Sequence, residues 1–230
     1  MENRLLVKDV FFDLDHTLWD FDKNSMLAFK RVFVKFKIEV EFDDFIKIYE
    51  PINLAYWKKY REERVTKEAL RRGRLIDSFK EFNKEYPVHF IDDMAEAYID
   101  ELPLDNHLFD GTLHILDYLT EKYQLHIITN GFEEVQYKKL KNSGIFHYFS
   151  TVTTSEEVGL KKPNPLVFEK AMEKANANPY LSVMIGDSFE ADILGADNLG
   201  MNTIFYNYRN ESIPNNFRKI NSLTEIKSHL

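Results

Sequence analysis

Short apolar runs alternate with longer amphipathic stretches over much of the chain. Runs rich in Val, Ile and Phe are typical of buried strands. The predicted strands are Val7–Phe12, Leu125–Thr129, Ser150–Thr153, Ser182–Ile185 and Asn202–Tyr206. Helical periodicity between the later strands predicts helices over Gly111–Lys122, Glu133–Ser143, Asn164–Ala175 and Asp192–Leu199. This alternation predicts a Rossmann-like α/β core, in which a parallel sheet carries helices on both faces.

The stretch that follows the first strand lacks strand signals and has helical periodicity instead. The predicted helices there are Lys23–Lys37, Phe42–Arg61, Lys67–Phe82 and Ile91–Leu102. Thr66 is a suitable N-cap, and Pro103 ends the last of these helices. The sequence therefore predicts an α/β core of residues 1–20 and 106–230, with an all-helical cap of residues 21–105 inserted into it. A further short helix is expected at Ser222–Leu230.

Composition narrows the possible classes of protein. The chain has 230 residues, of which 44% are apolar, enough for a sizeable core. It has no cysteine, which excludes disulfides, thiolate metal sites and cysteine nucleophiles. A net charge of −8 argues against binding a nucleic acid polymer but is compatible with a small anionic substrate. No segment resembles a leader or a membrane span, so a cytoplasmic protein is expected.

Two acids follow the first predicted strand. Asp13 and Asp15 are two residues apart, so in an extended chain their side chains face the same side. Neighbouring carboxylates repel each other unless a cation or a proton lies between them. Mg²⁺ prefers one or two carboxylates together with phosphate and water. One acid could be a nucleophile and the other a general acid or base, and two acids in a solvated turn are the alternative.

Hydrogen-bond donors and a cation follow the next two strands. Thr129 and Asn130 supply donors, and Gly131 frees the backbone at a helix start, which favours phosphate binding. A capped helix without a ligand is the alternative. Pro163 favours an extended Lys162, whose side chain could point inward as a fixed cation. A lone lysine is more often solvated, as we expect for Lys161.

A second acid pair follows the fourth predicted strand. Asp187 comes after Gly186, and Asp192 lies five residues further on. Each could merely stabilise the start of a helix. Along the chain, however, an acid pair, a threonine, a lysine and a second acid pair occur in order, each at the carboxyl end of a strand or in the following loop. Ligands of parallel sheets lie beyond those ends. One rim would then gather groups suited to phosphoryl transfer.

These motifs resemble the four motifs of the haloacid dehalogenase superfamily, in its phosphatase branch. They are DLDHT at Asp13–Thr17, Thr129 in ITN, Lys162 in KKP and GDSFEAD at Gly186–Asp192. The resemblance implies a Mg²⁺-dependent phosphomonoester hydrolase that forms an aspartyl phosphate. Asp15 favours phosphate transfer, because the dehalogenases of the superfamily lack an acid there. His16 stands where many relatives have Gly, and His tolerates unusual backbone angles better than most residues.

The resemblance also assigns roles to these residues. It implies that Asp13 attacks phosphorus and that Asp15 protonates the leaving oxygen and then activates water. Thr129 would donate to the phosphoryl group and Lys162 would neutralise Asp13. From their place at the helix start, rather than from the resemblance, Asn130 and Gly131 are expected to bind substrate. The implied Mg²⁺ ligands are the carboxylate of Asp13, the main-chain carbonyl of Asp15 and Asp187, with Asp192 in a supporting role.

The substrate is expected to be a small phosphorylated metabolite, chosen by the cap. The stretch NLAYWKKYREERVTKEALRRGRL resembles pyrimidine 5′-nucleotidases that act on noncanonical nucleotides, which implies substrates such as dUMP, UMP or dTMP. Trp57 is the candidate for stacking on the base, although spaced aromatics more often pack a core. Arg71, Arg72 and Arg74 could line the substrate side or form a solvated face.

Other functions remain open at this point. A sugar-phosphate phosphatase or a phosphomutase of the same superfamily would use the same Asp13 and Asp15. A signalling switch phosphorylated on an aspartate also combines acids, Thr and Lys on a parallel sheet. The second acid and the large insert argue against that switch.

Overall fold

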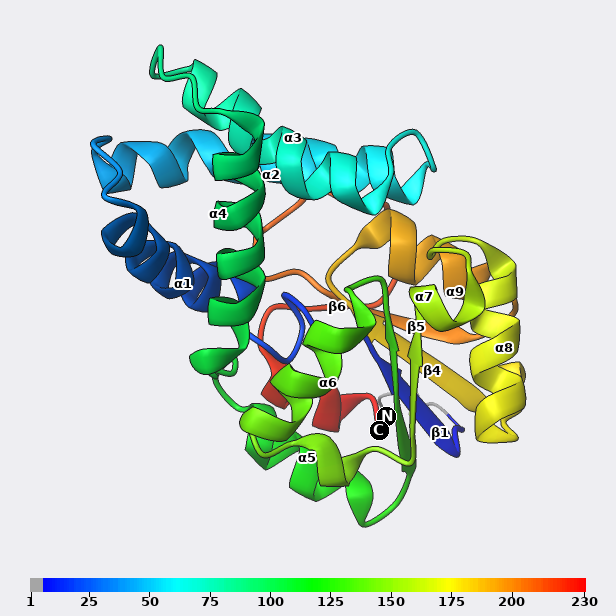
Figure 1. The fold of residues 1–230 in the computed structure, drawn as a ribbon. Coiled ribbons are helices and arrows are strands. Elements are labelled where there is room, and N and C mark those ends of the chain that lie inside the picture. The colour runs from blue at the N-terminus through cyan, green and yellow to red at the C-terminus, as the bar shows by residue number, and fades with distance from the viewer. Residues whose placement is uncertain (1–5) are drawn as a thin grey trace. The chain divides into compact units, whose positions relative to one another are not determined.

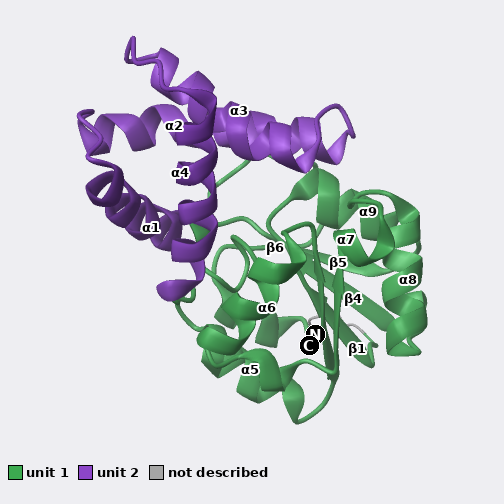
Figure 2. Ribbon diagram, in the orientation of Figure 1, with its two compact units in different colours: residues 1–21, 106–230 green, residues 22–105 purple. Residues whose placement is uncertain are grey.

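The computed structural model describes residues 6–230, and these divide into a unit with a sheet and a helical unit (Figure 2). Unit 1 joins the chain up to Phe21 with Asn106–Leu230, and unit 2 is Asp22–Asp105. No helix within residues 6–230 is both long enough and apolar enough to cross a membrane.

Unit 1 is built on a parallel sheet of six strands in the order β3-β2-β1-β4-β5-β6 (Figure 1). The strands are β1 (Asp9–Phe12), β2 (Gln124–Thr129), β3 (Thr151–Thr154), β4 (Ser182–Gly186), β5 (Asn202–Tyr206) and β6 (Lys219–Ile220). The predicted α/β class is confirmed. The edge strand β6 was not predicted, because two residues are too few to show a periodic pattern.

Helices cover both faces of this sheet. The α-helices are α5 (Thr112–Thr120), α6 (Glu133–Asn142), α7 (Ser155–Val158), α8 (Pro165–Ala175) and α9 (Gly195–Asp197). Shorter 3₁₀ turns are η2 (Phe146–Tyr148), η3 (Pro179–Leu181) and η5 (Leu223–Ser228), and η4 (Phe189–Leu194) is π-helical. Helices α5 and α6 lie on one side of the sheet and α8 and α9 on the other (Figure 1).

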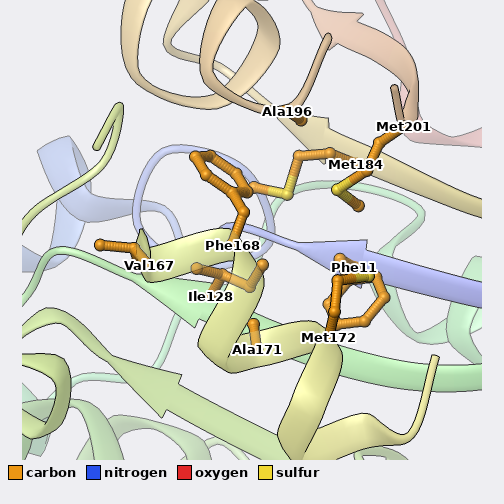
Figure 3. Packing of buried hydrophobic residues seen from close by; sticks show 9 residues of the cluster. All are labelled: Phe11, Ile128, Val167, Phe168, Ala171, Met172, Met184, Ala196 and Met201. Atoms are coloured by element: carbon orange, nitrogen blue, oxygen red, sulfur yellow. The ribbon is translucent and has the colours of Figure 1, made fainter. Parts of the chain in front are cut away.

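A core of buried side chains joins the sheet to α8 and α9 (Figure 3). Alternate strand residues point to opposite faces, and Phe11, Ile128 and Met184 of β1, β2 and β4 face α8, in one buried cluster with its residues Val167, Phe168 and Met172. Each large apolar side chain buried in this way contributes roughly 1.5–3 kcal/mol. This packing holds the strand ends rigidly.

The carboxyl end of β1 lies at the topological switch point of the sheet. β1 pairs with β2 on one side and with β4 on the other, and Phe12 is level with both Ile127 and Ile185. The chain continues to Asp13, whose amide donates to Ile185 O at 3.0 Å. Crevices at such switch points bind the ligands of open α/β sheets.

Unit 2 contains four α-helices, α1 (Phe21–Phe36), α2 (Phe42–Arg61), α3 (Lys67–Lys80) and α4 (Val88–Glu101), followed by the 3₁₀ turn η1 (Leu102–Leu104). Its interior is aromatic: Phe29 stacks on Tyr98 at 4.2 Å between ring centroids and meets Tyr49 edge-on at 4.5 Å. Thr66 caps α3 by accepting from the amide of Ala69 at 3.2 Å, as its position in the sequence indicated.

Two predicted helices differ from those observed. The segment expected to begin at Asp192 begins at Phe189 and is π-helical up to Leu194. Its N-cap is Ser188, whose hydroxyl accepts from the amide of Ala191 at 3.1 Å. The helix expected over Ser222–Leu230 is the 3₁₀ turn η5, which starts with a capping box between Ser222 and Glu225.

Candidate active site

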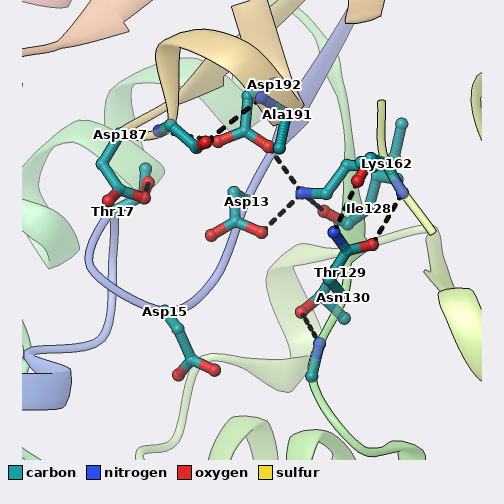
Figure 4. A network of polar contacts seen from close by, with 12 residues as sticks. Asp13, Asp15, Thr17, Ile128, Thr129, Asn130, Lys162, Asp187, Ala191 and Asp192 are labelled. Carbon is teal, nitrogen blue, oxygen red and sulfur yellow. Dashed lines mark hydrogen bonds and ion pairs between the residues drawn. The ribbon is translucent and has the colours of Figure 1, made fainter. Parts of the chain in front are cut away.

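Lys162 is the centre of a buried polar network at the carboxyl ends of β1, β2 and β4 (Figure 4). Its Nζ lies 2.6 Å from Asp13 Oδ1, 2.6 Å from the carbonyl oxygen of Ile128 and 2.7 Å from Asp192 Oδ1. The contact with Asp192 is an ion pair rather than a well-aligned hydrogen bond. The three partners match the three donors of an ammonium group. Lys162 is 1% exposed, so it is the inward-pointing cation that the sequence suggested.

The side chain of Asn130 holds the backbone of Lys162. Asn130 Nδ2 donates to Lys162 O at 2.9 Å, and the amide of Lys162 donates to Asn130 Oδ1 at 2.8 Å. This pair of bonds joins the loop after β2 to the loop that carries the lysine. The side-chain amide of Asn130 already makes these two hydrogen bonds to the Lys162 backbone. The expected contact between Asn130 and substrate stays a prediction.

Three carboxylates from two strand ends converge beside Lys162. Oxygen atoms of Asp13, Asp187 and Asp192 lie within 4.8 Å of one another. Asp187 accepts from Thr17 Oγ1 at 3.3 Å, and Asp192 Oδ2 accepts from the amide of Ser188 at 3.0 Å. A side chain at position 186 would collide with Asp192, so only glycine fits there. An all-oxygen donor set of this kind suits Mg²⁺.

Burial and neighbouring negative charges raise the pKa values of two of these acids, Asp13 and Asp187. Burial raises the pKa of Asp13 to about 7 against the opposing effect of Lys162, and the charges of Asp192 and Asp15 add to the rise. Partial burial, and then the charges of Asp13 and Asp192, raise the pKa of Asp187 well above its ordinary value. Burial alone would lower the pKa of Lys162, but Asp13 and Asp192 raise it. One buried cation thus faces three acids, an arrangement that favours a second cation.

The hydroxyl of Thr129 has both of its acceptor positions occupied. It accepts from the amide of Gly131 at 3.1 Å and from Gln136 Nε2 at 2.6 Å. A threonine hydroxyl has two acceptor positions and one proton, so the remaining proton of Thr129 is available for a phosphoryl oxygen. A Cβ at position 131 would overlap the side chain of Gln136, so glycine there leaves room for Gln136 to reach Thr129.

Asp15 lies apart from the three converging acids (Figure 4). Its Oδ1 is 2.6 Å from Lys139 Nζ, and its Oδ2 accepts from Gln136 Nε2 at 3.0 Å. The predicted contribution of Asp15 to a metal site is its main-chain carbonyl, which stays a prediction. His16, the next residue, has φ of 63°, and its Nδ1 lies 2.9 Å from the hydroxyl of Tyr208. His16 therefore has a left-handed backbone conformation, which His tolerates better than most residues.

Comparison with known proteins shows the family of this chain. Residues 10–206 match the family of haloacid dehalogenase-like hydrolases. The chain belongs to this family. The pyrimidine 5′-nucleotidase PynA of Streptococcus pneumoniae is 34% identical over 88% of this chain and 85% of its own length. A glyceraldehyde 3-phosphate phosphatase of Methanothermobacter thermautotrophicus is 32% identical over 88% of this chain and 86% of its own.

A solved structure of the same family is also similar. The HAD-hydrolase YfnB of Bacillus subtilis, in a structure bound to magnesium, superposes with a TM-score of 0.88 and 28% identity, over 97% of both chains. The resemblance that the four motifs indicated, including the likeness to pyrimidine 5′-nucleotidases, is thereby confirmed.

Two residues of this haloacid dehalogenase-like site were not identified from the sequence. Gln136 and Lys139 of α6 are buried and both contact Asp15. Burial lowers the pKa of Lys139, against the opposing charge of Asp15. A signal was present, because Phe132, Val135 and Leu140 form an apolar stripe at helical spacing and the two polar residues fall on that stripe.

The candidate residues of unit 2 have different surroundings. Trp57 is half-buried, with its ring 5.7 Å from that of Tyr60, and its contact with substrate stays a prediction. Arg72 pairs with Asp92 through two bonds of 2.8 Å. Arg74 is buried inside the unit and donates to Asn53 Oδ1 at 2.8 Å. The interpretation of the arginines as a solvated face is therefore wrong for Arg74.

Proposed function

We propose that this hydrolase is a Mg²⁺-dependent phosphomonoester hydrolase in which Asp13 is the nucleophile. The observation that carries the proposal is the shared position of the Asp13 carboxylate. One oxygen is bound by Lys162 at 2.6 Å, while the carboxylate also belongs to the group of acids suited to a divalent cation. A nucleophile between two cationic sites can accept a phosphoryl group whose charge those sites neutralise.

In the first half-reaction a carboxylate oxygen of Asp13 attacks phosphorus, and the bond from phosphorus to the ester oxygen breaks. Lys162 neutralises the transferring oxygens, and the Thr129 hydroxyl, whose acceptor positions are occupied, donates a hydrogen bond to one of them while keeping its proton. Asp15 gives its proton to the ester oxygen, which leaves as an alcohol. The products are the alcohol, the aspartyl phosphate on Asp13 and the carboxylate of Asp15.

In the second half-reaction water replaces Asp13 on phosphorus. The carboxylate of Asp15 removes a proton from the water as its oxygen attacks, and the bond between phosphorus and Asp13 breaks. This releases inorganic phosphate, restores the carboxylate of Asp13 and leaves Asp15 protonated for the next ester. The proton balance therefore closes on Asp15 alone.

Asp13 and Asp187 would hold the magnesium ion, with Asp192 in a supporting role because Lys162 and the amide of Ser188 already contact its two oxygens. When bound, the ion would favour the ionised form of Asp13 and offset negative charge on the phosphoryl group. The magnesium-bound structure of the relative YfnB supports this assignment.

For the substrate we propose a pyrimidine nucleoside 5′-monophosphate, selected by unit 2 acting as a cap. The likeness to PynA supports this choice. The second candidate is a sugar or triose phosphate, which the likeness to the glyceraldehyde 3-phosphate phosphatase favours. Either is a small metabolite, consistent with the cytoplasmic location expected from the sequence. A screen for phosphate release from nucleotides and sugar phosphates with Mg²⁺ separates the two candidates, and release without a bisphosphate activator excludes a phosphomutase.

The decisive experiment replaces Asp13 with asparagine. The substitution keeps the shape of the side chain but removes the nucleophilic charge, so we expect kcat to fall by roughly a thousandfold or more while the protein stays folded. Phosphate release with Mg²⁺ measures turnover. Mass spectrometry of the acid-quenched wild type should show an adduct of about 80 Da, the mass that one phosphoryl group adds, and Asp13→Asn should lack it. Asp197→Asn, at an exposed acid of α9, is the matched control. Near-normal turnover by Asp13→Asn would refute the covalent scheme.

A further inference from the structure

Helix α6 carries two polar side chains on its buried face. Gln136 is 0% exposed and Lys139 is 2% exposed, and they lie on the same stripe as Val135 and Leu140. Burying an ammonium group is unfavourable unless a partner compensates it, and an apolar side chain would pack this stripe at lower cost. The presence of both polar groups therefore requires an explanation beyond the packing of α6.

Both side chains converge on Asp15. Lys139 Nζ lies 2.6 Å from Asp15 Oδ1, and Gln136 Nε2 lies 3.0 Å from Asp15 Oδ2, so each carboxylate oxygen has its own donor. The Lys139 ammonium also lies over the ring of Trp19, 4.2 Å from its centroid, and 5.0 Å from the ring centroid of Phe21. These two rings restrict where the ammonium can go, because a cation is attracted to an aromatic face.

Gln136 also connects Asp15 to Thr129. The same Nε2 lies 2.6 Å from Thr129 Oγ1, so its two protons can serve one oxygen of each residue. The amide orientation follows from chemistry, because the reverse placement would set its carbonyl oxygen against a carboxylate. The group proposed to transfer protons and the group proposed to bind the phosphoryl oxygen are thus joined through one side chain.

We infer that Lys139 and Gln136 are positioning residues, which fix the Asp15 carboxylate relative to Thr129 and thereby govern protonation of the leaving oxygen. The inference rests on the proposed phosphatase function and extends it to two residues of α6. In this scheme neither residue transfers a proton or bonds to phosphorus, and both act through the Asp15 carboxylate that they hold. Loss of either should therefore matter most for esters whose oxygen must be protonated to leave.

The test compares two leaving groups. The alkyl ester UMP needs a proton on its departing oxygen, whereas p-nitrophenyl phosphate releases a stabilised phenolate without one. We expect Lys139→Met to lower kcat/KM for UMP by about 10- to 100-fold more than for p-nitrophenyl phosphate. Gln136→Leu should also lower kcat/KM for UMP more than kcat/KM for p-nitrophenyl phosphate. Lys139→Arg keeps the positive charge and should retain most of the wild-type kcat/KM for UMP. Lys138→Met, at the exposed neighbouring lysine, should leave both values unchanged.

The outcomes separate the inference from the proposed function. Equal losses on both substrates, or no loss, would mean that the two residues only stabilise the fold, and would overturn the inference while the phosphatase proposal stands. If the wild type hydrolyses p-nitrophenyl phosphate but neither UMP nor any other alkyl phosphate, the inference also fails. Absence of phosphate release from every ester would remove the proposed function itself. If Lys139→Met does not fold, Gln136→Leu decides.

Discussion

At the scale of single residues, the site is an imbalance of buried charge. Lys162 faces Asp13 and Asp192 directly, and Asp187 lies in the same group of oxygens. Burial and mutual repulsion raise the pKa values of Asp13 and Asp187, so their ionised forms are disfavoured in the metal-free fold. A divalent cation bound there would relieve the same repulsion, so we expect stability to depend on metal.

This imbalance predicts how metal-free stability depends on pH. Because the folded pKa of Asp13 is about 7 and that of Asp187 is also raised, the folded state holds more protons than the unfolded chain between about pH 4 and 7. The free energy of unfolding in chelator should therefore decrease as pH rises through that window. Asp187→Asn should flatten the decrease. Urea denaturation at several pH values measures the free energy of unfolding. If its dependence on pH is the same in Asp187→Asn as in the wild type, the raised pKa of Asp187 is contradicted.

Metal should then stabilise the fold at neutral pH. At a hundred times its Kd, Mg²⁺ should add about 2.7 kcal/mol to the free energy of unfolding. Asp187→Asn should remove most of this gain, because it replaces an anionic ligand with a neutral amide. Thermal unfolding with and without Mg²⁺ measures the effect independently of activity. Asp197→Asn, at an exposed acid, is the control and should keep the full gain.

At the scale of elements, strand ends, the π-helical turn η4 and the buried face of α6 position the site. β1 and β4 end together, with Phe12 level with Ile185, so Asp13 and Asp187 follow at neighbouring strand ends. The π-helical η4 brings Asp192 back towards Gly186, and α6 turns Gln136 and Lys139 towards Asp15. π-Helical turns recur at functional sites in other proteins, and η4 is consistent with that pattern.

Helix α3 offers a test of element stability away from the acids. Thr66 Oγ1 accepts from the amide of Ala69 at 3.2 Å, a bond that satisfies one of the free amides of the first turn. Thr66→Ala should lower the free energy of unfolding by about 1 kcal/mol, and Thr66→Ser should have little effect because it keeps the hydroxyl. Urea denaturation followed by circular dichroism gives both values. Equal losses in the two variants would show that the methyl group, rather than the cap, matters.

At the scale of the whole molecule, the chain separates the proposed chemistry from the proposed recognition. The acids, Thr129 and Lys162 all belong to unit 1, whereas Trp57 and the arginines belong to unit 2. Unit 2 has its own aromatic interior around Phe29, so its surface can differ between relatives without disturbing the sheet. In our proposal this is how hydrolases of one family act on different phosphate esters.

Replacing Trp57 with alanine tests this division. If the indole stacks on a pyrimidine base, Trp57→Ala should raise KM for UMP by roughly 5- to 100-fold, since stacking contributes about 1–3 kcal/mol per base. KM for p-nitrophenyl phosphate, which has no base, should change little. Leu54→Ala, at an exposed apolar residue of α2, is the matched control. Equal changes for both substrates would remove the stacking role and leave the chemistry of unit 1 untouched.

The positions of five strands along the chain and the chemical groups that follow them could be predicted without coordinates. Parallel strands in an α/β sheet end at one rim, so Asp13, Thr129, Lys162 and Asp187 were expected together there, and the structure brings them together. Local signals also predicted Thr66 as a cap and the boundaries of most helices to within a few residues. These features follow from contacts that are close in sequence or from a rule of topology.

Only the folded chain shows which polar side chains share partners. Gln136 and Lys139 contact Asp15 across 121 and 124 residues of sequence, and no periodic pattern specifies a pairing over that distance. The folded chain likewise buries Arg74 against Asn53 and lets Asn130 hold the backbone of Lys162. Periodicity indicates which face of an element is buried, whereas packing between distant elements decides which buried groups meet.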